Sequence, residues 1–136
     1  MSADSSPPAP EPSPDPEVVE LATRLFDMAR SGDAALGDYV DAGVPVDLRN
    51  QAGDSLLMLA AYHGHEAVVS ALLSRGADPD LANDRGHTPL AGAVFKGFDE
   101  VVGVLVDAGA DPHGGTPSAA DAAAMFGRDD LRALWS

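Results

Sequence analysis

The sequence contains no cysteine, few aromatic residues and no long apolar run. The lack of cysteine excludes disulfide bonds and zinc sites built on thiolates. Aromatic residues make up only 5% of the chain, which favours a core of small side chains between short helices over a barrel or sandwich. No apolar run is long enough to cross a bilayer, and no signal-peptide pattern is found. We therefore expect a cytoplasmic protein.

Basic residues are also scarce. Eight lysines and arginines stand against 22 aspartates and glutamates, which gives a net charge of −14. Such a chain repels nucleic acids and anionic membranes, so neither is expected as a partner. Apolar residues make up 45% of the 136 residues, which is enough for one domain with a buried core.

Residues 1–15 are rich in proline, serine and acidic side chains and offer no apolar face to bury. We expect a disordered tail there. A helix is predicted to follow, because Asp15 suits an N-cap, Pro16 suits the first helical position and Gly32 can end the helix. The apolar stripe of this helix is expected to include Val18, Leu21, Leu25 and Met28.

The strongest signal in the sequence is an internal repeat of 33 residues. When residues 50–82 are placed over residues 83–115, twelve positions are identical. Composition alone gives about two or three matches at a typical residue frequency near 7%. Both copies contain the tetrapeptide GADP, at 76–79 and at 109–112. The chain therefore contains a structural unit that occurs at least twice.

Each copy has the pattern of two short helices followed by an extended turn. Ser55 or Thr88 can cap the first helix, and a glycine then turns the chain into a second apolar stripe. The Asp-Pro pair after this stripe prevents helical continuation. One pair of helices cannot bury its own apolar face, so neighbouring pairs must stack. The sequence therefore predicts an all-α solenoid of stacked helix pairs with short hairpin loops.

These residues resemble the ankyrin repeat, whose signature runs G-x-T-P-L-H-x-A-A-x-x-G-H-x-x-V-V-x-x-L-L-x-x-G-A-D. Residues 86–111 read GHTPLAGAVFKGFDEVVGVLVDAGAD, and residues 53–78 read GDSLLMLAAYHGHEAVVSALLSRGAD. The resemblance implies an ankyrin domain over residues 16–136, with two full internal repeats and two degenerate caps. The four approximate ranges are 17–49, 50–82, 83–113 and 114–136.

The copies depart from the signature in two places. The histidine of T-P-L-H is replaced by Met58 in one internal copy and by Ala91 in the other. A hydrogen bond from that imidazole to the cap hydroxyl, worth about 1 kcal/mol net, cannot form, so we expect modest stability. The last repeat has a shortened hairpin, and its second helix is expected to take its apolar side from Leu131, Leu134 and Trp135.

The resemblance implies a non-catalytic monomer that binds one or more proteins as an adaptor, accessory or regulatory subunit. In ankyrin-like proteins partners dock on the concave surface formed by the hairpin tips and the first helices. The positions of this sequence that match that surface, and that we expect to bind a partner, are Arg49, Gln51, Asp54, Tyr62, His63, Asp84, Arg85, His87, Phe95, Lys96, Met125 and Phe126.

The positions just after the paired alanines of successive repeats include Tyr62, Phe95 and Phe126. They are expected to form an aromatic stripe, with Met125 beside it. Aromatic side chains and methionine are common anchors of binding surfaces. The alternative is that one or more of the rings pack against their own turn and belong to the core.

The sequence offers little for catalysis, and we expect neither an enzyme nor a cofactor. His63 and His65 form an H-x-H pair, but a metal site needs three or four converging ligands. His65 also occupies the G-H position of the signature, where an imidazole is expected to bind backbone groups. One other function remains open. The acidic chain could act as an inhibitor or decoy that blocks a basic site on a nucleic-acid-binding or toxic protein.

Overall fold

The computed structural model describes residues 15–135 and has eight α-helices in that range. Apart from Asp15, the predicted tail of residues 1–15 lies outside the described residues. The bounds are α1 (Pro16–Ser31), α2 (Leu36–Asp41), α3 (Leu56–Tyr62), α4 (Glu66–Leu73), α5 (Pro89–Lys96), α6 (Asp99–Asp107), α7 (Ala119–Met125) and α8 (Asp129–Arg132). None of these helices is long and apolar enough to cross a membrane.

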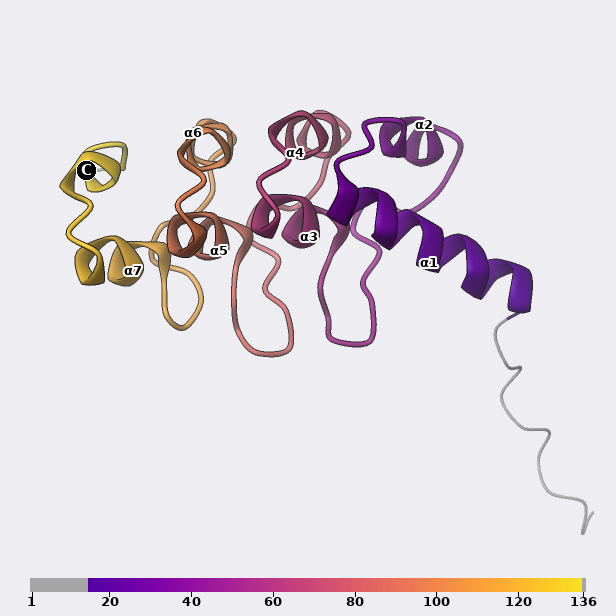
Figure 1. Ribbon diagram of the computed structural model, residues 1–136, viewed down its shortest axis with the longest axis horizontal. Coiled ribbons are helices and arrows are strands. Elements are labelled where there is room, and N and C mark those ends of the chain that lie inside the picture. Colours follow the sequence, from indigo (N-terminus) through magenta and orange to yellow (C-terminus); the bar gives the residue numbers. More distant parts are fainter. Residues whose placement is uncertain (1–14, 136) are drawn as a thin grey trace, which may run out of the picture.

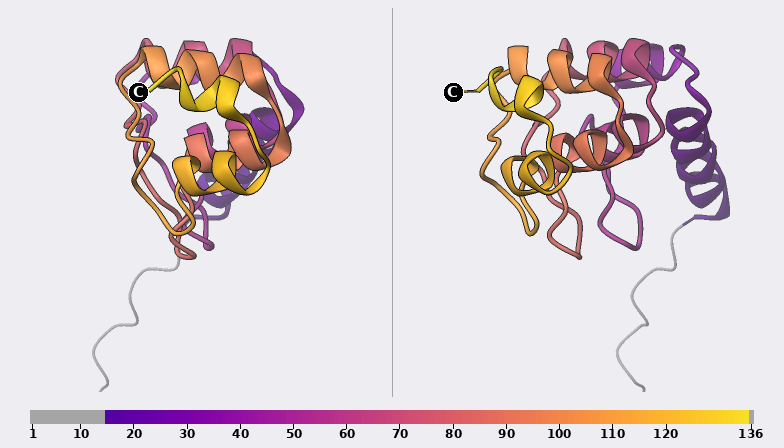
Figure 2. Two further views of the ribbon diagram at one scale, coloured as in Figure 1. Left: turned by 90° about the vertical axis from the view of Figure 1, so that its left-hand side faces the viewer. Right: turned by 60° about the vertical axis from the view of Figure 1, so that its left-hand side comes forward.

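The helices lie in two rows (Figure 1). The first row contains α1, α3, α5 and α7, and the second contains α2, α4 and α6; hairpin loops extend from the first row. Figure 2 shows the same layers along the stack, with the hairpins projecting together from one edge. The predicted all-α solenoid of stacked helix pairs is confirmed.

A buried hydroxyl begins each short helix of the first row. Ser55 Oγ accepts a hydrogen bond from the Met58 amide at 3.0 Å, and Thr88 Oγ1 accepts one from the Ala91 amide at 3.2 Å. Ser118 caps α7 in the same way. These bonds satisfy amides that the first helical turn leaves without a partner. The two predicted caps of the internal copies are therefore present.

Apolar side chains from both rows form one continuous core. Alanines such as Ala60 and Ala93 are fully buried on the first row, where their small size allows neighbouring helices to approach closely. Each fully buried leucine or valine contributes roughly 1.5–3 kcal/mol of transfer free energy. The largest of them are Leu25, Leu36, Leu56, Leu57, Leu72, Leu90, Leu105, Val68, Val69, Val94, Val101 and Val102.

Glycines at the turns between paired helices allow the next pair to pack closely. Gly64 has a φ of 78°, and a Cβ at this position would meet the ring of Phe98 at 2.8 Å. One unit earlier, a Cβ on Gly32 would meet the ring of His65 in the same way. Nε2 of His65 also forms a hydrogen bond of 2.6 Å with the carbonyl oxygen of Arg30. This contact agrees with the expectation that His65 binds backbone groups.

The hairpin tips are shaped by asparagines and tied to one another. Oδ1 of Asn50 and of Asn83 accepts hydrogen bonds from the amides two and four residues further on, at 2.9–3.0 Å. The amide of Asp84 donates to the carbonyl of Ala52 at 3.1 Å, and the amide of Thr116 donates to the carbonyl of Gly86 at 2.9 Å. The tips therefore form a connected edge.

Both ends differ from the predicted core. α1 extends beyond the rest of the stack (Figure 1), and Val18 is 59% exposed although the predicted stripe includes it. The fully buried part of α1 begins at Leu25. At the other end Leu131 is buried, but Leu134 is 49% exposed. The predicted core role of Leu134 is wrong, because α8 ends two residues before it.

Candidate functional site

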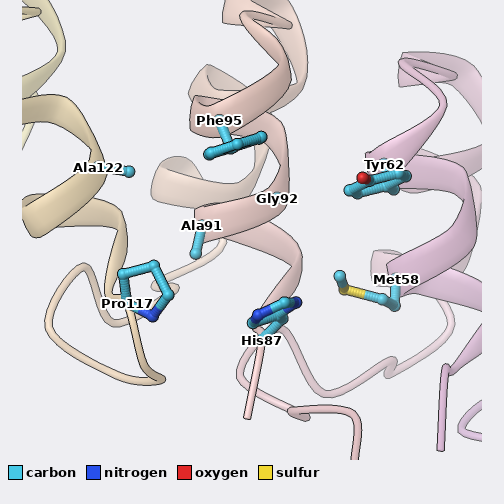
Figure 3. A pocket seen from close by; sticks show the side chains of 8 residues that line it. All are labelled: Met58, Tyr62, His87, Ala91, Gly92, Phe95, Pro117 and Ala122. Atoms are coloured by element: carbon cyan, nitrogen blue, oxygen red, sulfur yellow. The ribbon is translucent and has the colours of Figure 1, made fainter. Parts of the chain in front are cut away.

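A pocket of about 300 Å³ opens between α3, α5 and the start of α7. Figure 3 shows Tyr62 and Phe95 projecting from neighbouring helices at one end of the pocket. Met58 lies one helical turn before Tyr62, and His87 closes the end nearest the hairpins. The remaining walls are small and apolar; they are formed by Ala91, Gly92, Pro117 and Ala122.

Gly92 determines how closely α3 can pack against α5. A Cβ at this position would lie 3.2 Å from Cδ2 of Tyr62 and 3.3 Å from Cε of Met58. Glycine inside a helix costs roughly 0.5–1 kcal/mol relative to alanine. α5 therefore loses helix stability at Gly92, but Tyr62 and Met58 can pack directly against its backbone.

The three aromatic rings of the predicted stripe lie on the surface. Tyr62 is 37% exposed, Phe95 is 55% exposed and Phe126 is 49% exposed. Phe95 and Phe126 contact each other edge to face, with ring centroids 5.4 Å apart. Nζ of Lys96 lies 5.0 Å from the centroid of the Tyr62 ring, within cation–π range. None of the three rings belongs to the buried core.

Two further hollows continue from this pocket towards α1. One of about 240 Å³ shares Met58 and Tyr62 with it and is lined by Asp54 and Arg85 from the hairpins. The other hollow lies between α1 and the hairpin that contains residues 49–52, and it shares Ala52 with the hollow of 240 Å³. We call the three hollows, together with Lys96 and Phe126, the groove. Seven residues of the predicted set line the hollows, namely Arg49, Gln51, Asp54, Tyr62, Arg85, His87 and Phe95. Lys96 and Phe126 contact two of them, Tyr62 and Phe95.

The other three predicted residues lie at its border or outside it. His63 contacts the edge of Tyr62, with centroids 5.8 Å apart. Burial, and after it the nearby cationic side chains, lower the pKa of His63 below 6.5. Asp84 forms an ion pair of 3.5 Å with Arg49 across two hairpins. Met125 is 67% exposed and lines none of the three hollows.

Several pocket residues were not found by sequence reasoning. Met58 and Ala91 stand where the repeat signature has histidine, so the loss of the imidazole is also what makes the pocket wall apolar. The replacement of this histidine was the signal from which these two pocket residues could have been predicted. Gly92 gave none, because its role depends on contacts with α3. Other members that the sequence did not indicate are Pro117, Ala122, Val19 and Phe26.

Comparison with known proteins agrees with this architecture. A family model of ankyrin repeats, in three copies, matches residues 25–114. The chain belongs to the ankyrin-repeat family. The ankyrin repeat protein PA3287 of Pseudomonas aeruginosa is 48% identical over 62 residues, which cover 45% of this chain and 36% of that protein. The matched part therefore spans little more than a third of the relative.

Ankyrin repeats are in general non-catalytic modules that bind other proteins. In residues 15–135 of this ankyrin chain, no three histidine, aspartate or glutamate side chains lie together in a way that could hold a metal ion. His63 and His65 stack with centroids 6.5 Å apart, and His65 is already bonded to a backbone carbonyl. The groove instead offers apolar surface, aromatic rings and positive charge, which are means of binding.

Proposed function

We propose that this ankyrin-repeat chain binds a partner protein through the groove, as an adaptor, accessory or regulatory subunit. The observation that carries the proposal is the row of exposed aromatic rings beside an apolar pocket. Tyr62, Phe95 and Phe126 leave much of their ring surface in water, and large apolar groups gathered on a surface are typical of an interaction site. The monomeric state and the cytoplasmic location stay predictions.

The setting of these rings supports binding without large rearrangement. Tyr62 ends α3 and Phe95 lies in the last turn of α5, so both are carried by helices that pack into the core. The hairpin tips that complete the groove are joined by backbone hydrogen bonds. A surface that is ordered before binding loses less conformational entropy when the partner arrives.

The test compares the wild-type chain with the double variant Tyr62→Ala/Phe95→Ala in pull-downs from lysate of the source organism. We expect a partner that the wild type retains and the variant loses. Leu134→Ala, which removes an exposed apolar side chain from the C-terminal end, is the matched control and should retain the partner. Circular dichroism and thermal unfolding establish that all variants are folded. Equal recovery of the same partner by the folded double variant would contradict the proposal.

The acidic decoy is the second candidate, and one observation favours it. Glu66 and Glu100, on the adjacent helices α4 and α6, are close enough that a hydrogen bond between them raises the pKa of Glu66. The second row of helices therefore concentrates negative charge. Binding of a basic partner there should weaken steeply between low and moderate salt and should not respond to Tyr62→Ala/Phe95→Ala. Docking on the aromatic rings should instead be lost in Tyr62→Ala/Phe95→Ala.

A further inference from the structure

The positive charges of this acidic chain are not spread evenly. Of its eight basic residues, four lie along the groove. Arg30 and Arg49 line the hollow beside α1, Arg85 lines the middle hollow and Lys96 lies over the ring of Tyr62. Half of the cations of a molecule with a net charge of −14 therefore lie along the groove.

Most basic side chains elsewhere are held by carboxylates. Arg75 forms two hydrogen bonds with Asp41, at 2.9 and 3.0 Å, and Arg128 contacts Asp99 at 2.7 Å. Arg132 pairs with Asp129 at 3.4 Å. These contacts join or cap the outer helices and leave little free charge for a partner.

Two groove cations are different. Within residues 15–135, neither Arg85 nor Lys96 has a carboxylate oxygen within 4.0 Å. Arg85 is an exposed residue of the second hairpin tip, and Lys96 lies at the end of α5. Their charges are therefore available to a ligand that lies across the groove, one from the hairpin side and one from the helix side.

The pocket beside Tyr62 accepts apolar groups. Among the described residues its lining is almost entirely apolar, with His87 and the hydroxyl of Tyr62 as its polar groups, and none of these lining residues is acidic. The acidic residue of the adjoining hollow, Asp54, accepts a hydrogen bond from the side-chain amide of Asn83 at 2.8 Å. A volume of about 300 Å³ is enough for one large apolar side chain.

From this arrangement we propose that the groove binds an acidic linear segment of the partner, which places one apolar side chain between Tyr62 and Phe95. Its carboxylates lie beside Lys96 and Arg85. This inference rests on the proposed function and names the partner chemistry. A basic segment would meet like charges at both positions, and the acidic outer helices would attract it away from the groove.

A random library of 12-residue peptides displayed on phage, selected on the immobilised full-length chain, tests the inference. We expect the enriched peptides to be acidic and to contain a large apolar residue. Synthetic copies, measured by isothermal titration calorimetry, should bind Arg85→Glu/Lys96→Glu at least about tenfold more weakly than the wild type. Arg132→Glu makes the same charge change outside the groove and should leave the affinity within about twofold.

The outcomes separate this inference from the proposed function. Peptides that lose binding to Tyr62→Ala/Phe95→Ala but are basic or neutral would overturn the inference and leave the groove as the docking site. Peptides that bind both double variants as tightly as the wild type would overturn both the inference and the proposed function. Failure to enrich any peptide would overturn the proposal that the groove binds a linear segment. Selection on folded Arg85→Glu/Lys96→Glu adds a positive readout, because the enriched sequences should then become basic.

Discussion

Phe95 and Phe126 belong to successive repeats, and their rings contact each other edge to face with centroids 5.4 Å apart and an interplanar angle of 68°. Both rings remain about half exposed. The contact therefore joins α5 to the end of α7 at the surface and holds one side of the pocket in place. It is both a contact between repeats and part of the candidate binding surface.

The coupling between these rings can be measured. A double-mutant cycle of Phe95→Ala and Phe126→Ala should give a coupling of about 0.5–1.5 kcal/mol in the free energy of unfolding, as edge-to-face pairs do. Urea denaturation provides the values. A control cycle of Phe95→Ala with Leu134→Ala should be additive. Additivity in the Phe95/Phe126 cycle as well would show that the contact does not stabilise the stack.

Gly92→Ala should separate stability from binding. The new methyl group gains up to about 1 kcal/mol of helix stability, but it also crowds Tyr62 and Met58 and narrows the pocket. Because Tyr62 is partly exposed and Met58 is flexible, we expect the melting temperature to hold or rise while groove peptides bind more weakly. Gly103→Ala in α6, where a Cβ meets nothing within 4 Å, should raise the melting temperature without changing binding. Unchanged binding by Gly92→Ala would contradict the role assigned to Gly92.

The two leucines at the C-terminal end should respond very differently to truncation. Leu131 is 3% exposed, so Leu131→Ala should cost about 2–5 kcal/mol in the free energy of unfolding. Leu134→Ala should cost less than about 1 kcal/mol, because that side chain is half exposed. Chemical denaturation of the two variants side by side measures the difference. Equal losses would place Leu134 in the core after all.

His63 should make stability depend on pH. Its pKa is lowered from 6.5, chiefly by burial, so the unfolded chain takes up a proton at a higher pH than the folded chain. Above pH 6.5 this imidazole is neutral in both states and contributes nothing to the pH dependence. As the pH falls below 6.5, protonation of the imidazole stabilises the unfolded state, and the free energy of unfolding decreases. Urea midpoints between pH 8 and pH 5 should therefore fall less for His63→Gln than for the wild type. An equal fall in the two proteins would contradict this contribution of His63.

The stack of helix pairs follows from the sequence alone. Hydroxyl caps such as Ser55 and Thr88, glycine turns and apolar stripes are local signals, and their recurrence every 33 residues fixes how the units must pile up. The sequence also predicted that Tyr62, Phe95 and Phe126 lie along one stripe, because a regular stack brings the ends of successive first helices together.

Which apolar side chains remain in water depends on the tertiary packing. Val18 and Leu134 have the character of core residues, but within residues 15–135 no neighbouring unit covers them at the two ends of the stack. The pocket likewise requires Gly92 of one repeat to meet Tyr62 of the preceding one, a contact that no local pattern encodes. Exposure and shape depend on what the adjacent unit supplies, and for this reason the sequence could predict the repeat but not the surface it builds.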